Sequence, residues 1–120
     1  KVLNLGHTIG HALEAHQLQI KAPITHGHAV AWGLFIEGHI SKQQGIMNGQ
    51  ELFEIQQVVS HIYAPLPWNQ LDVSLLSKYL DQDKKNQDHQ WRYVAIETAG
   101  VYHIDAVINT QELEAALEAL

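Results

Sequence analysis

The segment that decides the fold lies at the start of the chain and reads Leu3-Asn4-Leu5-Gly6-His7-Thr8-Ile9-Gly10-His11-Ala12-Leu13-Glu14. Ile9 and Leu13 recur at the spacing of one helix face, so we predict a helix from about Gly6 to His16. His7 and His11 are four residues apart, which places both imidazoles on one face of that helix, one turn apart. Two such rings can converge on one metal ion or one anion, although the same spacing occurs in pairs that make only ordinary hydrogen bonds.

Two glycines alternate with these histidines. Gly6 and Gly10 have no propensity reason to lie in a helix, because glycine is among the weakest helix formers. Glycine is used where a ligand or another backbone comes close. The sequence therefore leaves two explanations open, a ligand at this face or tight packing against a second helix.

A second group of histidines follows and reads Thr25-His26-Gly27-His28. It lies at the predicted start of a long helix, and the loop formed by residues 17–25 can bring His26 back beside His7. Two imidazoles are good zinc ligands, but a catalytic zinc takes three protein ligands and one open position. Candidates for the third are His11, Glu14, Glu37 or a residue from another part of the protein.

The rest of the chain alternates between helix signals and breaks. We expect a helix from His26 or Gly27 to about Gln44, a helix opened by an Asn48–Glu51 capping box and ending near His61, a break at Pro65 and Pro67, and a helix from Val73 to Leu80 capped by Asp72. After a polar loop, Asp81 to Gln90, we expect strands Trp91–Ile96 and Val101–Ile104 joined by a turn at Ala99–Gly100, then a helix from Gln111 to Leu120 capped by Asn109 and Glu112. The predicted fold class is mainly α, a multihelical domain with one small β-hairpin. No βαβ alternation is present, so these residues contain no dinucleotide-binding fold.

The composition of the chain excludes several kinds of protein. The chain has 120 residues, which is the size of one domain, and 46% of them are hydrophobic against 17% charged. A formal net charge of -6 argues against a nucleic-acid partner, and no apolar run is long enough to span a membrane. The chain has no Cys, which removes disulfide scaffolds and thiolate zinc sites and fits a cytoplasmic protein. The unusual feature is nine His, of which six lie in the first third.

Two adjacent lysines occur in the polar loop, in the run Asp83-Lys84-Lys85. They could contact a phosphate or carboxylate, but by composition alone a solvated loop is the better explanation. We expect the three tryptophans, Trp32, Trp68 and Trp91, to lie in the core or an interface. We expect the three late histidines, His61, His89 and His103, to be structural or on the surface.

Taken together, three motifs resemble one known family. They are residues 3–14 quoted above, then His26-Gly27-x-Ala29-Val30-Ala31-x-Gly33, then Asp83-Lys84-Lys85, and their order and spacing are similar to the C-terminal domain of 3-dehydroquinate synthase. The resemblance implies an enzyme that uses NAD and a divalent metal, usually zinc with cobalt possible, to convert the phosphorylated keto acid DAHP into 3-dehydroquinate and phosphate. It further implies the shikimate route to aromatic amino acids, a cytoplasmic location and a homodimer at full length.

The resemblance also implies roles for single residues. His7 and His26 would bind the metal, with a Glu of the N-terminal domain as the third ligand. His11 would be the catalytic group that contacts substrate, assisting phosphate loss or proton transfer, while Asn4 and Lys84 or Lys85 would bind substrate. No residue of the chain would bind NAD. His28 departs from the pattern, because the family usually has Glu there, and we expect this to change a contact behind the metal ligands; His16 and His39 are expected to have no part in the site.

The chain begins at Lys1, and we expect residues 1–120 to be one metal- and substrate-binding domain of a longer enzyme, whose N-terminal NAD-binding domain is absent. The fragment alone is therefore expected to be inactive and to bind zinc weakly. Three alternatives remain. The chain could belong to another sugar-phosphate cyclase, such as a 2-deoxy-scyllo-inosose synthase, or to a metal-dependent polyol dehydrogenase of related fold. A non-enzymatic metal-binding helical module would explain the histidines but not their glycine and lysine context.

Overall fold

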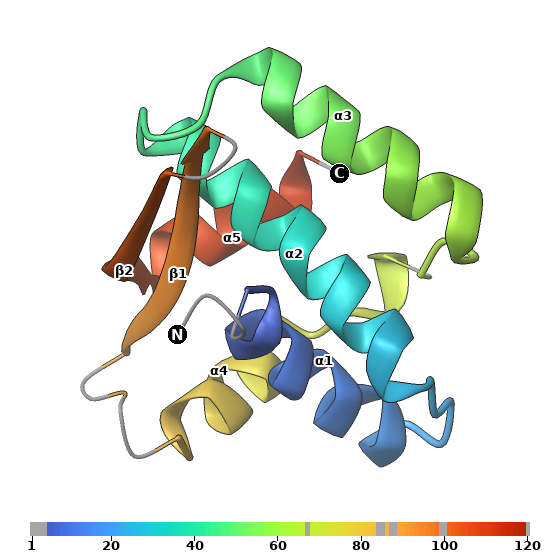
Figure 1. The fold of residues 1–120 in the computed structure, drawn as a ribbon. Coiled ribbons are helices and arrows are strands. Elements are labelled where there is room, and N and C mark those ends of the chain that lie inside the picture. The colour runs from blue at the N-terminus through green and yellow to red at the C-terminus, as the bar shows by residue number, and fades with distance from the viewer. Residues whose placement is uncertain (1–4, 67, 84–85, 87–88, 99–100, 120) are drawn as a thin grey trace.

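The computed structural model describes residues 5–66, 68–83, 86, 89–98 and 101–119. Its elements follow in the order α1 (His7–Gln19), α2 (His26–Gln43), α3 (Gly49–Ile62), a 3-10 turn η2 (Trp68–Gln70), α4 (Val73–Asp81), β1 (Gln90–Thr98), β2 (Val101–Asn109) and α5 (Thr110–Glu118) (Figure 1). The two strands form one antiparallel sheet. The predicted fold class, mainly α with one β-hairpin, is confirmed.

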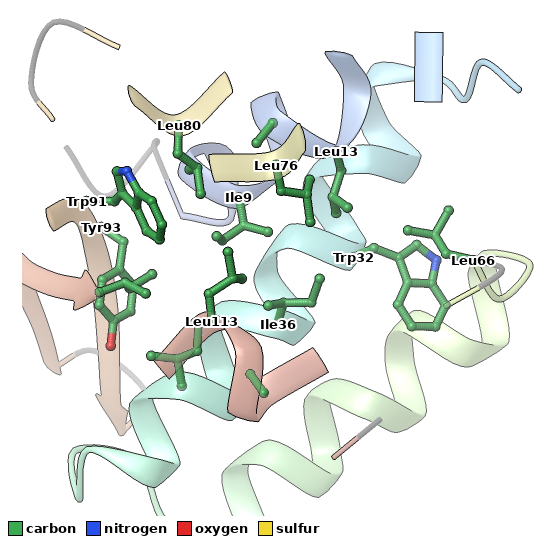
Figure 2. Packing of buried hydrophobic residues seen from close by; sticks show 14 of the residues in the cluster. Ile9, Leu13, Trp32, Ile36, Leu66, Leu76, Leu80, Trp91, Tyr93 and Leu113 are labelled. Carbon is green, nitrogen blue, oxygen red and sulfur yellow. The ribbon is translucent and has the colours of Figure 1, made fainter. Parts of the chain in front are cut away.

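Helix α2 is the centre of the molecule, because α1, α3, α5 and β1 all pack against it (Figure 1). The core lies between α1, α2, α4, α5 and the hairpin, where Ile9, Ile36, Leu80, Trp91 and Leu113 point toward one another (Figure 2). Each of these side chains is 2% exposed or less. Trp32 is also buried, beside Leu66, so the prediction for two of the three tryptophans is confirmed. The side chain of Trp68 lies outside the described residues.

Helices α1 and α2 approach so closely that glycine is required at the contact. A Cβ on Gly33 would lie 2.2 Å from the Gly6 oxygen and 2.5 Å from the Gly10 nitrogen, both of them backbone atoms. Gly6 itself has a φ of 75°, in the left-handed region that glycine adopts without strain. Of the two explanations for these glycines, tight helix packing is the one found in the structure.

The predicted caps Asn48, Asp72 and Asn109 all lie at helix starts, and Thr25, which was not predicted as a cap, has the same role at α2. The side chains of Thr25, Asn48 and Asp72 accept hydrogen bonds from the first-turn N–H groups of α2, α3 and α4. At α3 the structure shows one half of the predicted capping box, in which Asn48 accepts the Glu51 N–H, whereas at α5 the full box forms, with Asn109 and Glu112 each accepting the other's backbone N–H. Helix α1 differs, since its cap residue Gly6 has no side chain to offer.

Two elements extend well beyond their predicted ends, and β1 (Gln90–Thr98) extends slightly beyond the predicted Trp91–Ile96. Helix α1 continues to Gln19 and not only to His16, because the buried Gln17 side chain binds the His16 ring and the Ala22 oxygen, which holds the last turn in place. Strand β2 continues from Ile104 to Asn109, because it pairs with β1 as far as Gln90 despite two register shifts. Both extensions depend on contacts made across the fold, which local patterns do not record.

Several predicted features lie outside the described residues: Asn4, Pro67, Lys84, Lys85, the turn at Ala99–Gly100, and Leu120. Among the helices that are described, none combines the length and the apolar character needed to cross a membrane.

Candidate functional site

Three imidazole rings converge where α1 meets the start of α2. The ring centroids of His7 and His26 lie 5.5 Å apart, those of His7 and His11 5.4 Å, and those of His11 and His26 5.9 Å. His7 and His11 come from consecutive turns of α1, and His26 is the first residue of α2. The expectation that the connecting loop returns His26 to His7 is confirmed.

His7 and His26 have the same arrangement of hydrogen bonds. The Nδ1 of His7 lies 3.1 Å from the Leu5 oxygen, and the Nδ1 of His26 lies 3.0 Å from Glu14 Oε1. A carbonyl or a carboxylate only accepts, so Nδ1 must carry the proton in both rings. The Nε2 lone pair of each ring is therefore left for another partner. Metal-binding histidines usually show this arrangement, with an outer group fixing the ring and its tautomer.

His11 differs from its two neighbours. Within the described residues, neither of its ring nitrogens has a hydrogen-bond partner, and the ring lines a cavity of about 310 Å³ between α1 and α4. Although the His11 side chain is exposed, partial desolvation by surrounding atoms, followed by the charges of His7 and His26, lowers its pKa, while Glu14 and Asp83 act in the opposite direction. Tyr79 and Asp83 line the same cavity. His11 thus faces open space with a ring that favours the neutral form.

The donor set fits a zinc or cobalt ion. The ligand nitrogens of the three histidines lie within 4.8 Å of one another. Zinc–nitrogen bonds of about 2.0–2.1 Å in a tetrahedral site put ligand nitrogens about 3.4 Å apart. Small movements of the rings would be enough to bring the nitrogens to that separation. The site is also accessible, since His11 and His26 are exposed and His7 is partly buried.

Two carboxylates weighed as third ligands have other partners. Glu14 binds His26, as described above, and Glu37 on α2 is fully inside the protein. Its Oε2 accepts the Ile9 N–H at 2.9 Å and its Oε1 the Gly6 N–H at 3.3 Å. Burial raises the pKa of Glu37 to about 8, although the backbone N–H groups of Ile9, Gly6 and Thr8 oppose the shift. Sequence reasoning missed this role of Glu37. The signal that could have indicated it is Gly6, which stands at the cap position of α1 and has no side chain to accept a hydrogen bond.

The remaining histidines lie apart from this group. His16 is fully buried, and its Nε2 accepts the Asp72 N–H at 3.0 Å while Nδ1 donates to Gln17. His39 is partly buried on α2. The three late histidines are exposed and bind nearby acceptors, His61 the Gln57 oxygen, His89 Asp81 and His103 Glu97. Their predicted structural or surface positions are confirmed.

Comparison with known families shows to which family the chain belongs. Residues 1–86 match the model of the 3-dehydroquinate synthase C-terminal family. The chain belongs to this family. A 3-dehydroquinate synthase from Picrophilus torridus is 37% identical over 107 residues, 88% of this chain and 30% of the relative. Another, from Parabacteroides distasonis, is 29% identical over 118 residues, 98% of this chain and 33% of the relative. The chain therefore spans about a third of the length of these curated relatives.

Solved structures share the fold of this chain. A 2-deoxy-scyllo-inosose synthase complexed with carbaglucose-6-phosphate, NAD+ and Co2+ superimposes with a TM-score of 0.77 at 20% identity, covering 97% of this chain and 32% of the neighbour. A 2-epi-5-epi-valiolone synthase from Streptomyces hygroscopicus, with NAD+ and Zn2+ bound, gives 0.76 at 19% identity, covering 99% and 32%. At this identity the likeness establishes the fold.

His28, where the resemblance leads us to expect Glu, contacts the residues that directly follow α3. Its Nε2 donates to the Ala64 oxygen at 2.8 Å, and its ring stacks on Tyr63 with centroids 5.1 Å apart. Trp32 donates to the same oxygen at 3.0 Å. In this member of the family, His28 therefore helps to attach the end of α3 to α2.

Proposed function

We propose that this chain is the metal- and substrate-binding domain of a 3-dehydroquinate synthase, which converts DAHP into 3-dehydroquinate and phosphate. The observation that carries the proposal is the convergence of His7, His11 and His26 in a member of this family. The rings of His7 and His26 each donate a hydrogen bond from Nδ1 to an outer partner, the Leu5 oxygen and the Glu14 carboxylate respectively. The complete enzyme would act in the shikimate route, in the cytoplasm, and as a homodimer.

His7 and His26 would hold the metal through Nε2, and a Glu of an NAD-binding domain preceding this one would be the third ligand. When bound, a zinc or cobalt ion would supply Lewis-acid polarisation of the alcohol that NAD oxidises. The choice of NAD and of these metals is supported by the NAD+ with Co2+ or Zn2+ in the two structural neighbours. NAD itself would bind outside this chain.

His11 would be the catalytic group of the domain. Its neutral ring has no competing hydrogen bond among the described residues and faces the cavity, so it can take a proton from substrate or hold one beside the departing phosphate. Asn4 and Lys84 or Lys85 would add substrate contacts, the lysines by pairing with phosphate or carboxylate. These three residues enter the proposal on the family motif alone.

Substitution of single histidines by Gln separates the two roles. In the full-length protein, His7→Gln and His26→Gln should weaken Co2+ or Zn2+ binding by more than the roughly 10–100-fold typical of losing an outer partner. His11→Gln should keep the metal and lower phosphate release by about 10²–10⁴-fold. His61→Gln removes an exposed imidazole on α3 and serves as the control. Loss of the metal in His11→Gln would instead favour a three-histidine metal site.

Phosphate release from DAHP by the full-length protein with NAD tests the activity. Release from a hexose 6-phosphate and not from DAHP would favour a 2-deoxy-scyllo-inosose synthase. NAD reduction by glycerol without phosphate release would favour a polyol dehydrogenase. The 120-residue chain alone should show no turnover and only weak zinc binding by calorimetry, because it lacks the third ligand and the NAD-binding domain. Tight stoichiometric binding would favour a self-contained metal module.

A further inference from the structure

Glu37 makes an unusual contact between the two helices that carry the histidines. It lies on α2 and is 2% exposed, yet its carboxyl group faces the first turn of α1. Its two oxygens accept the N–H groups of Gly6 and Ile9, and the Thr8 N–H also faces it. Helix α1 has no side-chain cap of its own, so its unpaired N–H groups are satisfied by a residue from another helix.

The charged form of such a carboxyl group is costly to bury, because it loses its hydration, and this cost raises the pKa of Glu37 to about 8. Among the described residues, no Lys or Arg bonds to Glu37, and the N–H groups at the positive end of the α1 dipole are its partners. An apolar side chain would avoid the cost but leave those N–H groups buried without acceptors. The arrangement therefore ties the position of the α1 start to α2.

The contacts fix how α1 is placed along α2. Gly6 lies against Leu34 and Gly10 against Ala29, so the helices run antiparallel. Glu37 binds α1 at one end of this pair, and Glu14 binds His26 at the other. His7 lies between Gly6 and Ile9, the two residues whose N–H groups Glu37 accepts. Movement of the first turn of α1 along α2 would carry the His7 ring with it and change its distance from His26.

We propose that Glu37 is a positioning residue, which holds the first turn of α1 on α2 and thereby sets the separation of the His7 and His26 rings. The inference rests on the proposed metal-binding role of those rings, but it concerns a geometry that exists without the metal. A purely structural role would lower the stability of the fold and leave the ring separation in the folded protein unchanged. The two readings therefore differ in what the folded variant shows.

The test compares Glu37→Gln with Ser41→Ala. Gln keeps the volume and one accepting oxygen, but its amide NH2 cannot accept the second N–H, whereas either oxygen of the carboxyl group can accept with or without the proton. Ser41 is buried on the next turn of α2 and bonds the Tyr93 hydroxyl at 3.1 Å, so Ser41→Ala disturbs the same helix without touching α1. In metal-free protein labelled with 13C-histidine, we expect the nuclear Overhauser contact between the His7 and His26 rings in wild type and Ser41→Ala. We expect it to be lost or strongly weakened in Glu37→Gln.

Cobalt binding provides the second measurement. Glu37→Gln should shift the visible Co2+ spectrum and weaken Co2+ affinity by about 10–100-fold, and Ser41→Ala should do neither. A folded Glu37→Gln protein with unchanged ring contacts would overturn the inference. If neither Glu37→Gln nor Glu37→Asp folds, Glu37 supports the fold itself and the inference is equally rejected. A wild-type protein that shows the ring contact but binds no Co2+ would contradict the proposed function and leave the ring contacts to decide on Glu37.

Discussion

Gly33→Ala should separate the two helices that build the site. The added Cβ would lie 2.2 Å from the Gly6 oxygen, and real Cβ contacts are essentially never shorter than 3.0 Å. The backbones must therefore move apart by about 0.8 Å or more, because neither the Gly6 nor the Gly10 backbone can rotate away as a flexible side chain would. Forcing extra volume into a packed interior costs about 1–3 kcal/mol, and the better helix propensity of Ala returns up to about 1 kcal/mol.

We therefore expect the free energy of unfolding to fall by about 2 kcal/mol, because the clash is with backbone and lies at the upper end of that range. For a chain of this size, that corresponds to a decrease in Tm of about 6–10 °C, measurable by circular dichroism. Metal affinity should fall by at least about 10-fold, since ligand positions in metal sites tolerate only about 0.2 Å. Titration with Co2+ measures this second effect.

Gly38→Ala is the matched control on the same helix. Its Cβ would meet the end of the Leu52 side chain at 3.2 Å, and that side chain can move. We expect unchanged or slightly higher stability, by up to about 1 kcal/mol, and unchanged Co2+ binding. If Gly33→Ala were as stable as Gly38→Ala and bound Co2+ as tightly as wild type, the close contact of α1 with α2 would be refuted.

Three further predictions concern the buried and outer groups. The folded protein keeps the Glu37 proton up to a pKa of about 8, while the unfolded chain releases it near 4.5. The free energy of unfolding should therefore fall as the pH rises between these two values, by at most about 1.4 kcal/mol per pH unit. Denaturation measured across this pH range should show a smaller fall in Glu37→Gln. Glu14→Gln should weaken Co2+ affinity about 10-fold by loosening His26, and an unchanged affinity would contradict the outer role of Glu14. His16→Leu leaves the Asp72 N–H without its acceptor and should lower the free energy of unfolding by about 1–3 kcal/mol in urea denaturation; an equal midpoint would contradict this.

Local patterns were sufficient for most of the fold. The spacing of Ile9 and Leu13 predicted α1, and the polar residues Asn48, Asp72 and Asn109 marked three helix starts that the structure confirms. These signals work because helix periodicity and caps depend on residues within a few positions of one another. The motifs built around His7 and His26 also indicated the family, which the family match confirms.

What the sequence alone determined was therefore the set of elements, the histidines they carry and the family. Only the tertiary structure decided the roles of the other residues in α1 and α2. Gly6, Gly10 and Gly33 serve a helix contact, Glu14 orients His26, and Glu37 caps α1 from a helix about 30 positions away in sequence. Each of these roles depends on which backbone lies opposite, and no spacing along the chain contains that information. The physical reason is that an unpaired N–H group or a missing Cβ is satisfied through space, by whichever neighbour the fold provides.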